Sequence, residues 1–129
     1  MFKKLEELEV YQLAEKLADG IWDLCIQWDS FAKFTVGEQL VTAADSIAAN
    51  ISEGHGRFSL KENLRFCYFA RGSLDETRNW IRRASRRCLL SPVQANGIND
   101  IISILGPKLN AYINSIRRHV HQGTLITGD

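Results

Sequence analysis

Apolar residues recur along most of the chain at steps of three and four positions, which is the spacing of one face of an α-helix. Four stretches carry this pattern, and they predict helices over about residues 8–28, 36–53, 60–88 and 92–120. Residues 121–129 show no periodicity, so we expect a frayed tail there. The predicted connections are short, roughly 3–7 residues, which favours an all-α, antiparallel up-down-up-down four-helix bundle formed by residues 1–129 as a single domain.

Capping residues mark three of the predicted helix starts. Thr35 and Glu38 have the spacing of a capping box, in which the first side chain accepts from the third helical amide and the second reaches back. Ser59 and Glu62 repeat this spacing before the third helix. The segment Ser91–Gln94 places a proline at the first position of the fourth helix.

Glycine and proline predict where the helices are interrupted. Gly54 follows the second predicted helix, and we expect it to end that helix as a left-handed cap. Gly106 and Pro107 lie inside the fourth helix. Proline there removes a backbone hydrogen bond, so we expect a kink rather than a fifth helix. Residues 30–34, which precede the second helix, are predicted to form a loop.

Composition favours a folded protein that stays in the cytoplasm. Hydrophobic residues make up 45% of the 129 and charged residues 24%, which is ordinary for a globular chain. The N-terminus lacks the apolar core of a signal peptide, and no apolar run approaches the roughly 18 residues of a membrane span. Cys25, Cys67 and Cys88 are odd in number and widely spaced, so we interpret them as small buried residues rather than a disulfide or zinc framework.

Charge is distributed unevenly along the chain. Residues 1–56 carry four basic and ten acidic side chains, a net charge of −6, whereas residues 57–129 carry twelve basic and five acidic ones, a net charge of +7. Such asymmetry can indicate contact with nucleic acid. It can also indicate helices of opposite sign that lie side by side in a bundle or in an oligomer, which is the interpretation we favour.

A succession of short motifs extends from the first predicted helix to the third. They are an opening Leu-Glu-Val-aromatic-Gln, a central Ser-Ile-x-x-Asn-Ile-x-Glu-Gly, an Arg-x-Ser turn, a Lys-Glu pair and a Gly-Ser-Leu-x-Glu segment. The matching residues are Leu8, Glu9, Val10, Tyr11, Gln12, Ser46, Ile47, Asn50, Ile51, Glu53, Gly54, Arg57, Ser59, Lys61, Glu62, Gly72, Ser73, Leu74 and Glu76. With this succession the chain resembles, over essentially residues 3–120, the four-helix-bundle family named for proteins encoded in intervening sequences of bacterial 23S ribosomal RNA genes.

The resemblance implies a cyclic homo-oligomer of four-helix bundles, a pentamer with a central channel, and it implies no known enzymatic activity. Related proteins include the accessory subunits of diversity-generating retroelements, which bind nucleic acid and a reverse transcriptase through basic surfaces. For most of the family no physiological role is established. Family members often carry an Arg-Arg pair before the small-residue run of the second helix, and this chain departs from them by having Val41 and Thr42 there.

The residues themselves predict neither an enzyme nor a cofactor or metal site. A di-iron bundle needs Glu-x-x-His motifs, and none of His55, His119 and His121 has a glutamate three residues earlier. His119 and His121 have a spacing that could ligate a metal, but their place at a helix end favours a solvated tail. The chain also lacks a dinucleotide fingerprint, a nucleophile elbow and a phosphate-binding loop.

Polar residues in the last turn of the second predicted helix admit two interpretations. A functional one makes Glu53 an acid, a base or a ligand. A structural one, which we favour, has Asn50 bond the backbone across the turn at Gly54 and pairs Glu53 with Arg57, because an unpaired buried carboxylate is costly.

Arginines form two parallel rows on the third predicted helix, with members four residues apart: Arg78, Arg82 and Arg86, and beside them Arg83 and Arg87. Guanidinium groups about 6 Å apart can follow phosphates, which makes RNA or DNA a candidate partner. The alternatives are a solvated face, or pairing with an acidic row on the first helix that consists of Glu15, Asp19 and Asp23.

Aromatic residues off the main apolar stripes of the first and third helices suggest an oligomer interface: Trp22, Phe66, Phe69 and Trp80. Exposed together, they would make a larger apolar patch than a monomer normally tolerates. The sequence therefore predicts a non-enzymatic homo-oligomeric scaffold or binding protein, with an unidentified protein as a further candidate partner. A nucleic-acid-binding accessory protein that uses the arginine rows is the alternative.

Overall fold

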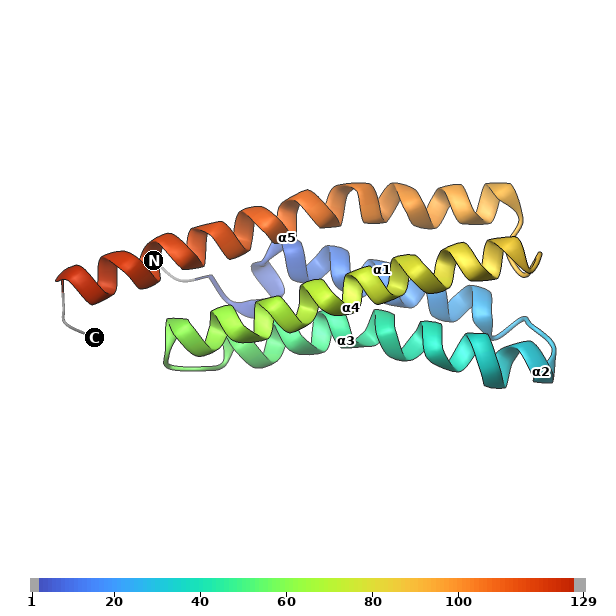
Figure 1. Cartoon of the computed structure of the whole chain (residues 1–129), viewed down its shortest axis with the longest axis horizontal. Helices are drawn as coiled ribbons and strands as arrows, with labels where there is room; N and C mark the ends of the chain where they lie inside the picture. The colour runs from blue at the N-terminus through green and yellow to red at the C-terminus, as the bar shows by residue number, and fades with distance from the viewer. Residues whose placement is uncertain (1–2, 127–129) are drawn as a thin grey trace.

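The computed structural model describes residues 3–126 of the chain, and helices account for nearly all of them (Figure 1). In chain order the elements are the 3-10 turn η1 (Leu5–Glu7), α1 (Glu9–Cys25), α2 (Ser30–Ala32), the π-helical segment η2 (Lys33–Gly37), α3 (Glu38–His55), α4 (Leu60–Arg86) and α5 (Pro92–Ile126). The fold rests on four long helices, and no strand occurs within the described residues. The all-α prediction is therefore confirmed.

The long helices lie side by side in an elongated molecule (Figure 1). α3 packs against α1 and α4, and α5 packs against α4 and α1. As a result α1 and α4 occupy diagonal positions in the bundle. α5 is the longest helix, and it extends beyond the turn between α3 and α4 (Figure 1). Because α1 and α4 are diagonal, their outward side chains lie on different faces of the molecule.

Side chains from all four long helices fill a single apolar core. Its largest fully buried apolar side chains are Leu17, Ile21, Leu40, Ile47, Ile51, Leu74, Leu105, Leu109 and Ile113. Burying one side chain of this size stabilises a fold by about 1.5–3 kcal/mol. Thr77 is also fully buried, and its hydroxyl donates to the Ser73 carbonyl at 2.8 Å, so no buried hydroxyl is left without a partner at this position.

Two of the three predicted helix starts have the expected caps. The Ser59 hydroxyl accepts from the Glu62 amide at 3.3 Å, at the start of α4. Before α5, the Ser91 hydroxyl accepts from the Gln94 amide at 3.1 Å while the Gln94 side chain accepts from the Ser91 amide at 2.9 Å. This reciprocal pair satisfies two amides that would otherwise lack partners.

The capping box predicted at Thr35 is wrong. Asp29 caps this part of the chain, because its carboxylate accepts from the Ala32 amide at 3.0 Å, and helical backbone runs on from α2 through η2 into α3. Thr35 therefore lies inside a helical segment, and its hydroxyl donates to the Phe31 carbonyl at 2.7 Å. Residues 30–34, predicted as a loop, are helical for the same reason.

Gly54 does not act as the predicted left-handed cap. It is buried inside α3, which ends one residue later at His55, and the C-cap Gly56 has a right-handed φ of −78°. Gly54 is required for space instead. A Cβ there would lie 2.6 Å from Asn63 Oδ1 and 2.9 Å from Phe66 Cβ, so only glycine lets α3 approach α4 this closely.

α5 passes through Pro107 as one helix, so no fifth helix begins there, as predicted. The end of α5 differs from the prediction. The helix continues to Ile126, beyond the end predicted at residue 120, and residues 127–129 of the predicted tail lie outside the described range. Within the described residues, no helix combines the length and hydrophobicity needed to cross a membrane.

The cysteines were predicted to be buried alike, and one of them is not. Cys25 and Cys67 are buried, whereas Cys88 is exposed, past the end of α4. Cys88 has a left-handed φ of 61°. Its amide bonds the Ser85 carbonyl at 3.1 Å, and the Leu89 amide bonds the Ala84 carbonyl at 2.9 Å. This hydrogen-bond pattern is the one that usually has glycine at the left-handed position.

Candidate functional site

The arginine rows of α4 divide into an exposed group and one residue used in packing. The exposed group consists of Arg82, Arg83, Arg86 and Arg87, and among the described residues none of these four makes an ion pair. Arg78 is partly buried and donates to Asp75 Oδ1 at 2.9 Å. Its guanidinium lies against Gly106 of α5, where a Cβ would come within 2.7 Å of Nη2. Arg78 is therefore held between helices rather than presented to a ligand.

The acidic row of α1 faces away from these arginines. Its members, Glu15, Asp19 and Asp23, are exposed. α1 does not neighbour α4, so the two rows do not pair within one chain, and that alternative for the arginines is wrong. α3 extends the acidic face, because its Asp45 lies close enough to Asp19 for the two charges to interact. Burial raises the pKa of Asp45, and the negative charge of Asp19 raises it further.

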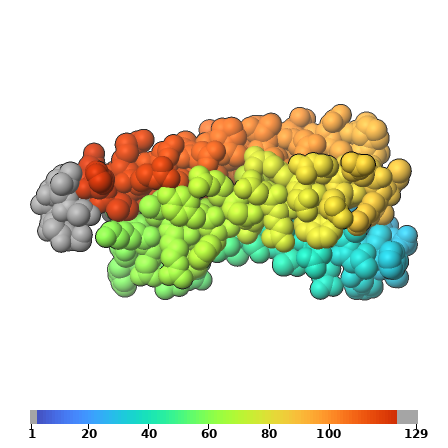
Figure 2. All heavy atoms as spheres, in the orientation of Figure 1, coloured from blue at the N-terminus to red at the C-terminus, as the bar shows by residue number. Residues whose placement is uncertain are grey.

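α4 and α5 together form one continuous face of the molecule (Figure 2). Most of the chain's basic side chains are on these two helices or at their ends. The bundle thus has an acidic side made by α1 and α3 and a basic side made by α4 and α5. The charge asymmetry along the sequence becomes an asymmetry in space.

The aromatic residues predicted for one interface are on two separate faces. Trp22, on α1, is 52% exposed, whereas Phe69, on α4, is 47% exposed. Phe66 and Trp80 are partly buried. Phe66 packs edge-to-face against Phe69 with ring centroids 5.7 Å apart, and the Arg65 guanidinium lies 5.5 Å from the Phe69 ring. The apolar surface of α4 is therefore mixed with positive charge.

A second cluster of arginine and aromatic side chains connects α4 with α5. The Arg117 guanidinium donates to the Tyr68 hydroxyl at 2.7 Å, and the Arg71 guanidinium lies 5.1 Å from the centre of the Tyr68 ring. Arg71 also donates to Asn110 Oδ1 at 3.3 Å. The sequence signal for this cluster is the three-residue step from Tyr68 to Arg71, which places both on one helix face. Its α5 member could not be predicted without the packing of α4 against α5.

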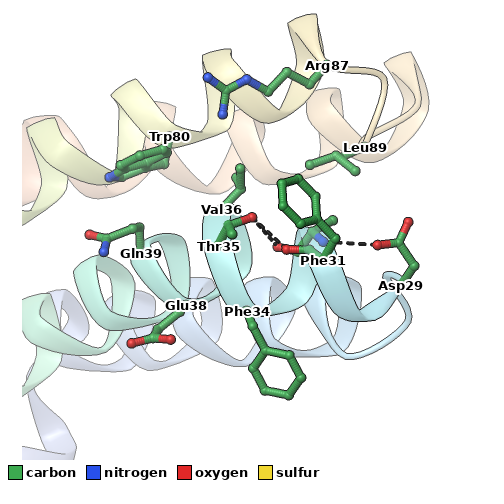
Figure 3. Close-up of a pocket in the computed structure, with 11 residues that line it drawn as sticks. Asp29, Phe31, Phe34, Thr35, Val36, Glu38, Gln39, Trp80, Arg87 and Leu89 are labelled. Atoms are coloured by element: carbon green, nitrogen blue, oxygen red, sulfur yellow. Dashed lines mark hydrogen bonds between the residues drawn. The ribbon is translucent and has the colours of Figure 1, made fainter.

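A cavity of about 730 Å³ lies where η2 meets the end of α4. Trp80, Val36, Phe31 and Leu89 surround it, and the Arg87 side chain extends above them (Figure 3). Phe31 is 81% exposed. Apolar side chains therefore remain accessible to solvent at this end of the bundle, beside the exposed arginines.

A scan of known families identifies the chain. The family model described as "23S rRNA-intervening sequence protein" matches residues 6–111. The chain belongs to this family. Among solved structures, a crystal structure of a protein with unknown function from the S23 ribosomal protein family of Bacteroides thetaiotaomicron is similar, with a TM-score of 0.75. The two chains share 22% identity over 81% of this chain and 97% of that chain, a level at which the likeness shows the fold alone. No curated protein matches the chain.

The central motif that suggested the 23S rRNA-intervening sequence family has a structural arrangement at the α3–α4 turn. The structure brings Glu53 and Arg57 together, with Nη2 2.8 Å from Oε2, and both side chains are exposed. Asn50 does not bond across the turn as predicted. Its amide donates to the Ser46 carbonyl at 2.8 Å, one turn back in the same helix, which is a common use of a short polar side chain inside a helix.

The sequence did not reveal the role of Asn63, a buried polar residue beside this motif. Asn63 is 8% exposed, and its Oδ1 accepts from the Cys67 thiol at 3.5 Å, directly against Gly54. The available signal was an asparagine in the first turn of α4, on the same face as Cys67. Among the described residues, no group of three or more histidine, cysteine or carboxylate side chains could hold a metal ion.

Proposed function

We propose that this member of the 23S rRNA-intervening sequence family is a non-enzymatic scaffold, an up-down-up-down bundle that assembles into a cyclic homo-oligomer. The observation that carries this proposal is the placement of two unlike surfaces on diagonal helices. The α1 surface is acidic and includes Trp22. The α4 surface is basic and includes Phe69.

Two unlike surfaces that bind each other produce a head-to-tail contact. Such a contact closes into a ring when the rotation between subunits divides the circle, whereas a two-fold dimer would bring like surfaces together. Half-exposed aromatic rings supply apolar area at the contact, and Trp and Tyr side chains often dominate binding energy at interfaces. The number of subunits comes only from the resemblance to the family, which implies five.

Charge complementarity supports the same pairing of surfaces. Glu15, Asp19 and Asp23 of one subunit would meet the basic face of the next, which increases the association rate and disfavours contacts between like faces. Exposed charges are screened by salt, so we expect the oligomer to dissociate more readily as ionic strength rises.

Trp22→Glu and Phe69→Glu test the head-to-tail contact, with mass measured by light scattering after gel filtration. Each variant alone should be monomeric, because each lacks one of the two surfaces. Mixed in equal amounts, they should form a one-to-one heterodimer, since each supplies the surface that the other lacks. Phe34→Glu is the matched control, because Phe34 is 69% exposed but lies on neither helix, and it should keep the wild-type mass. A wild-type mass for Trp22→Glu, or no heterodimer in the mixture, would contradict the proposal.

A second candidate function, nucleic-acid binding, is favoured by four exposed arginines on α4 or at its end that make no ion pair with any described residue. Arg82, Arg83, Arg86 and Arg87 could contact phosphates, and a ring would repeat the row in every subunit. Binding would be weakly sequence-specific, because phosphate contacts carry no base information.

Titration with labelled RNA and duplex DNA at about 50 and 200 mM salt tests this function, since affinity that depends on phosphate contacts falls steeply with salt. The double variant Arg82→Gln/Arg86→Gln should weaken binding, whereas Lys4→Gln/Lys16→Gln, which removes the same charge from the acidic half, should not. Absence of binding at 50 mM salt would remove this candidate and leave a protein partner as the next one to seek.

A further inference from the structure

A second cavity, of about 650 Å³, lies at the end of the bundle where α3 turns into α4. The N-terminal segment, the end of α3, the first turn of α4 and the part of α5 near His119 all contribute to its lining. Its volume falls in the range of about 300–1,000 Å³ that is typical of small-molecule sites. It is distant from the exposed arginines near the end of α4, because Asn63 and Arg82 are about 28 Å apart along α4 at 1.5 Å per residue.

The charge around this cavity favours an anion. Lys3 and Arg57 line it, and no carboxylate of a described residue does. Arg57 is largely neutralised, since its guanidinium lies 2.8 Å from Glu53 and 3.9 Å from Glu62. The Lys3 ammonium makes no ion pair with any described residue, so its charge is available to a ligand.

Two histidines add hydrogen-bonding groups to the same cavity. His55 Nε2 lies 2.9 Å from the Lys3 carbonyl oxygen, and His119 Nδ1 lies 2.7 Å from the Ser115 carbonyl oxygen. A carbonyl oxygen only accepts, so each of these ring nitrogens carries a hydrogen. The other nitrogen of each ring is left for a ligand, and it becomes an N–H donor when the imidazole takes up a proton. Hydrogen bonds from a protonated imidazole to an anion are among the stronger ones in proteins.

The rest of the cavity wall is largely apolar. Leu8, Leu60 and Ile116 line it, and Phe58 stands at its edge with a fully exposed ring. A ligand with an apolar part would cover that ring. Such coverage favours binding, because it removes apolar surface from water.

We propose that this cavity binds a small amphipathic anion, a carboxylate or a phosphate monoester that carries an apolar chain. The anionic group lies between Lys3, His55 and His119. The apolar chain lies against Leu60, Ile116 and Phe58. This binding site goes beyond the proposed scaffold function and does not depend on it.

Calorimetric titration of the full chain with decanoate and with decyl phosphate tests the proposal. At least one of these anions should bind once per chain, because its charged group pairs with Lys3 and its apolar chain covers Phe58. The more tightly bound of the two identifies the anionic group. Decanol and inorganic phosphate should bind at least tenfold more weakly, since each lacks one half of the ligand. Equal binding of decanol, or no binding of either anion, would overturn the proposal.

The variant His119→Gln tests whether His119 itself contacts the anion, as opposed to a general attraction of the anion to positive charge. It should lower the affinity at least fivefold, because one ring nitrogen that faces the ligand is lost. The groups besides the two imidazoles that titrate or carry charge around the cavity are Lys3, Arg57, Tyr112, Glu53 and Glu62, and all of them stay in place in this variant. His121→Gln is the matched control, because His121 is an exposed histidine two residues further along α5 that does not line the cavity. Equal effects of the two variants would contradict the proposed site, and circular dichroism checks that both remain helical.

Discussion

The two ends of the bundle are built in different ways. At the α3–α4 turn, helix backbones touch through Gly54, and buried Asn63 and Cys67 bond each other just beneath the contact. At the opposite end, which we call the open end, helical backbone already begins at Ser30 and continues through the π-helical η2 into α3. Phe31 in this segment has 81% of its surface exposed. At the first end the α3 and α4 backbones are in close contact next to the cavity of about 650 Å³, whereas at the open end the helical segment before α3 is left largely on the surface. This difference separates residues that hold the fold from residues that are available for contacts.

Truncation of one apolar side chain at each end should show the difference most strongly. Ile51→Ala, in the fully buried part of α3, should lower the free energy of unfolding by about 2–5 kcal/mol, because it leaves a cavity. Phe31→Ala should lower it by less than about 0.5 kcal/mol, since its ring is mostly in water. Urea unfolding measures both values. A comparable loss for Phe31→Ala would mean that the open end also holds the fold.

A methyl group at Gly54 is the next test. Gly54→Ala should lower the free energy of unfolding by about 1–3 kcal/mol, because the new Cβ overlaps Asn63 and Phe66 and forces α3 away from α4. Gly72→Ala is the control in α4, where nothing lies within 4 Å of the added atom. That variant should gain about 1 kcal/mol from helix propensity alone. Stabilisation by both variants would show that the close approach is dispensable.

The buried thiols should make stability depend on alkaline pH. Burial raises the pKa of Cys67 to about 12 and that of Cys25 to about 11, from 9.0. The unfolded chain therefore loses these protons first, and stability that is complete below about pH 9 decreases as pH rises toward 11. Each thiol contributes a slope of about 1.4 kcal/mol per pH unit.

Unfolding measured from pH 8 to pH 10.5 in a reducing buffer checks this slope. Cys67→Ala should remove one thiol's share of it, whereas Cys88→Ala should leave it unchanged, because Cys88 is exposed in the folded chain. An unchanged slope in Cys67→Ala would contradict the assignment.

The smallest expected effect is a gain at the open end. Cys88→Gly should stabilise the protein by about 1 kcal/mol, because Cys88 has a left-handed φ that costs a residue with a Cβ about 1–2 kcal/mol. Thermal melting detects a change of this size. Cys88→Ala should show no such gain, since alanine has the same backbone restriction as cysteine.

The sequence predicted those parts of the fold that depend on residues close together along the chain. The helix starts at Ser59 and Ser91 were found because their signals, a capping-box spacing and a proline at the first helical position, lie within four residues. The start of the helical segment before α3 was not found, because Asp29 and Thr35 are both good capping residues and only the structure shows that Asp29 is the cap. Gly54 was placed correctly but explained wrongly, since glycine serves a left-handed turn and a close approach equally well.

The candidate surfaces were harder to predict, because they depend on which helices are neighbours. Trp22 and Phe69 were expected on one patch, yet α1 and α4 are diagonal, and the two rings lie on different faces. Arg78 has the same spacing as Arg82 and Arg86, but Gly106 of α5 leaves room for its guanidinium and holds it. A periodic pattern gives the face of a helix, and it does not say what lies opposite that face.

The π-helical segment Lys33–Gly37 also affects how the residues of α2 are rotated about the helix axis relative to α3. A turn closed by i→i+5 bonds contains one residue more than an α-helical turn, so residues 30–34 are rotated by about 100° relative to the stripe of α3. Among residues 30–34, Phe31 and Phe34 are 81% and 69% exposed. Loss of one residue from the segment would re-register the helix and turn a different set of side chains toward the core. The exposed aromatic surface at this end is therefore determined by the length of the chain there as much as by its composition.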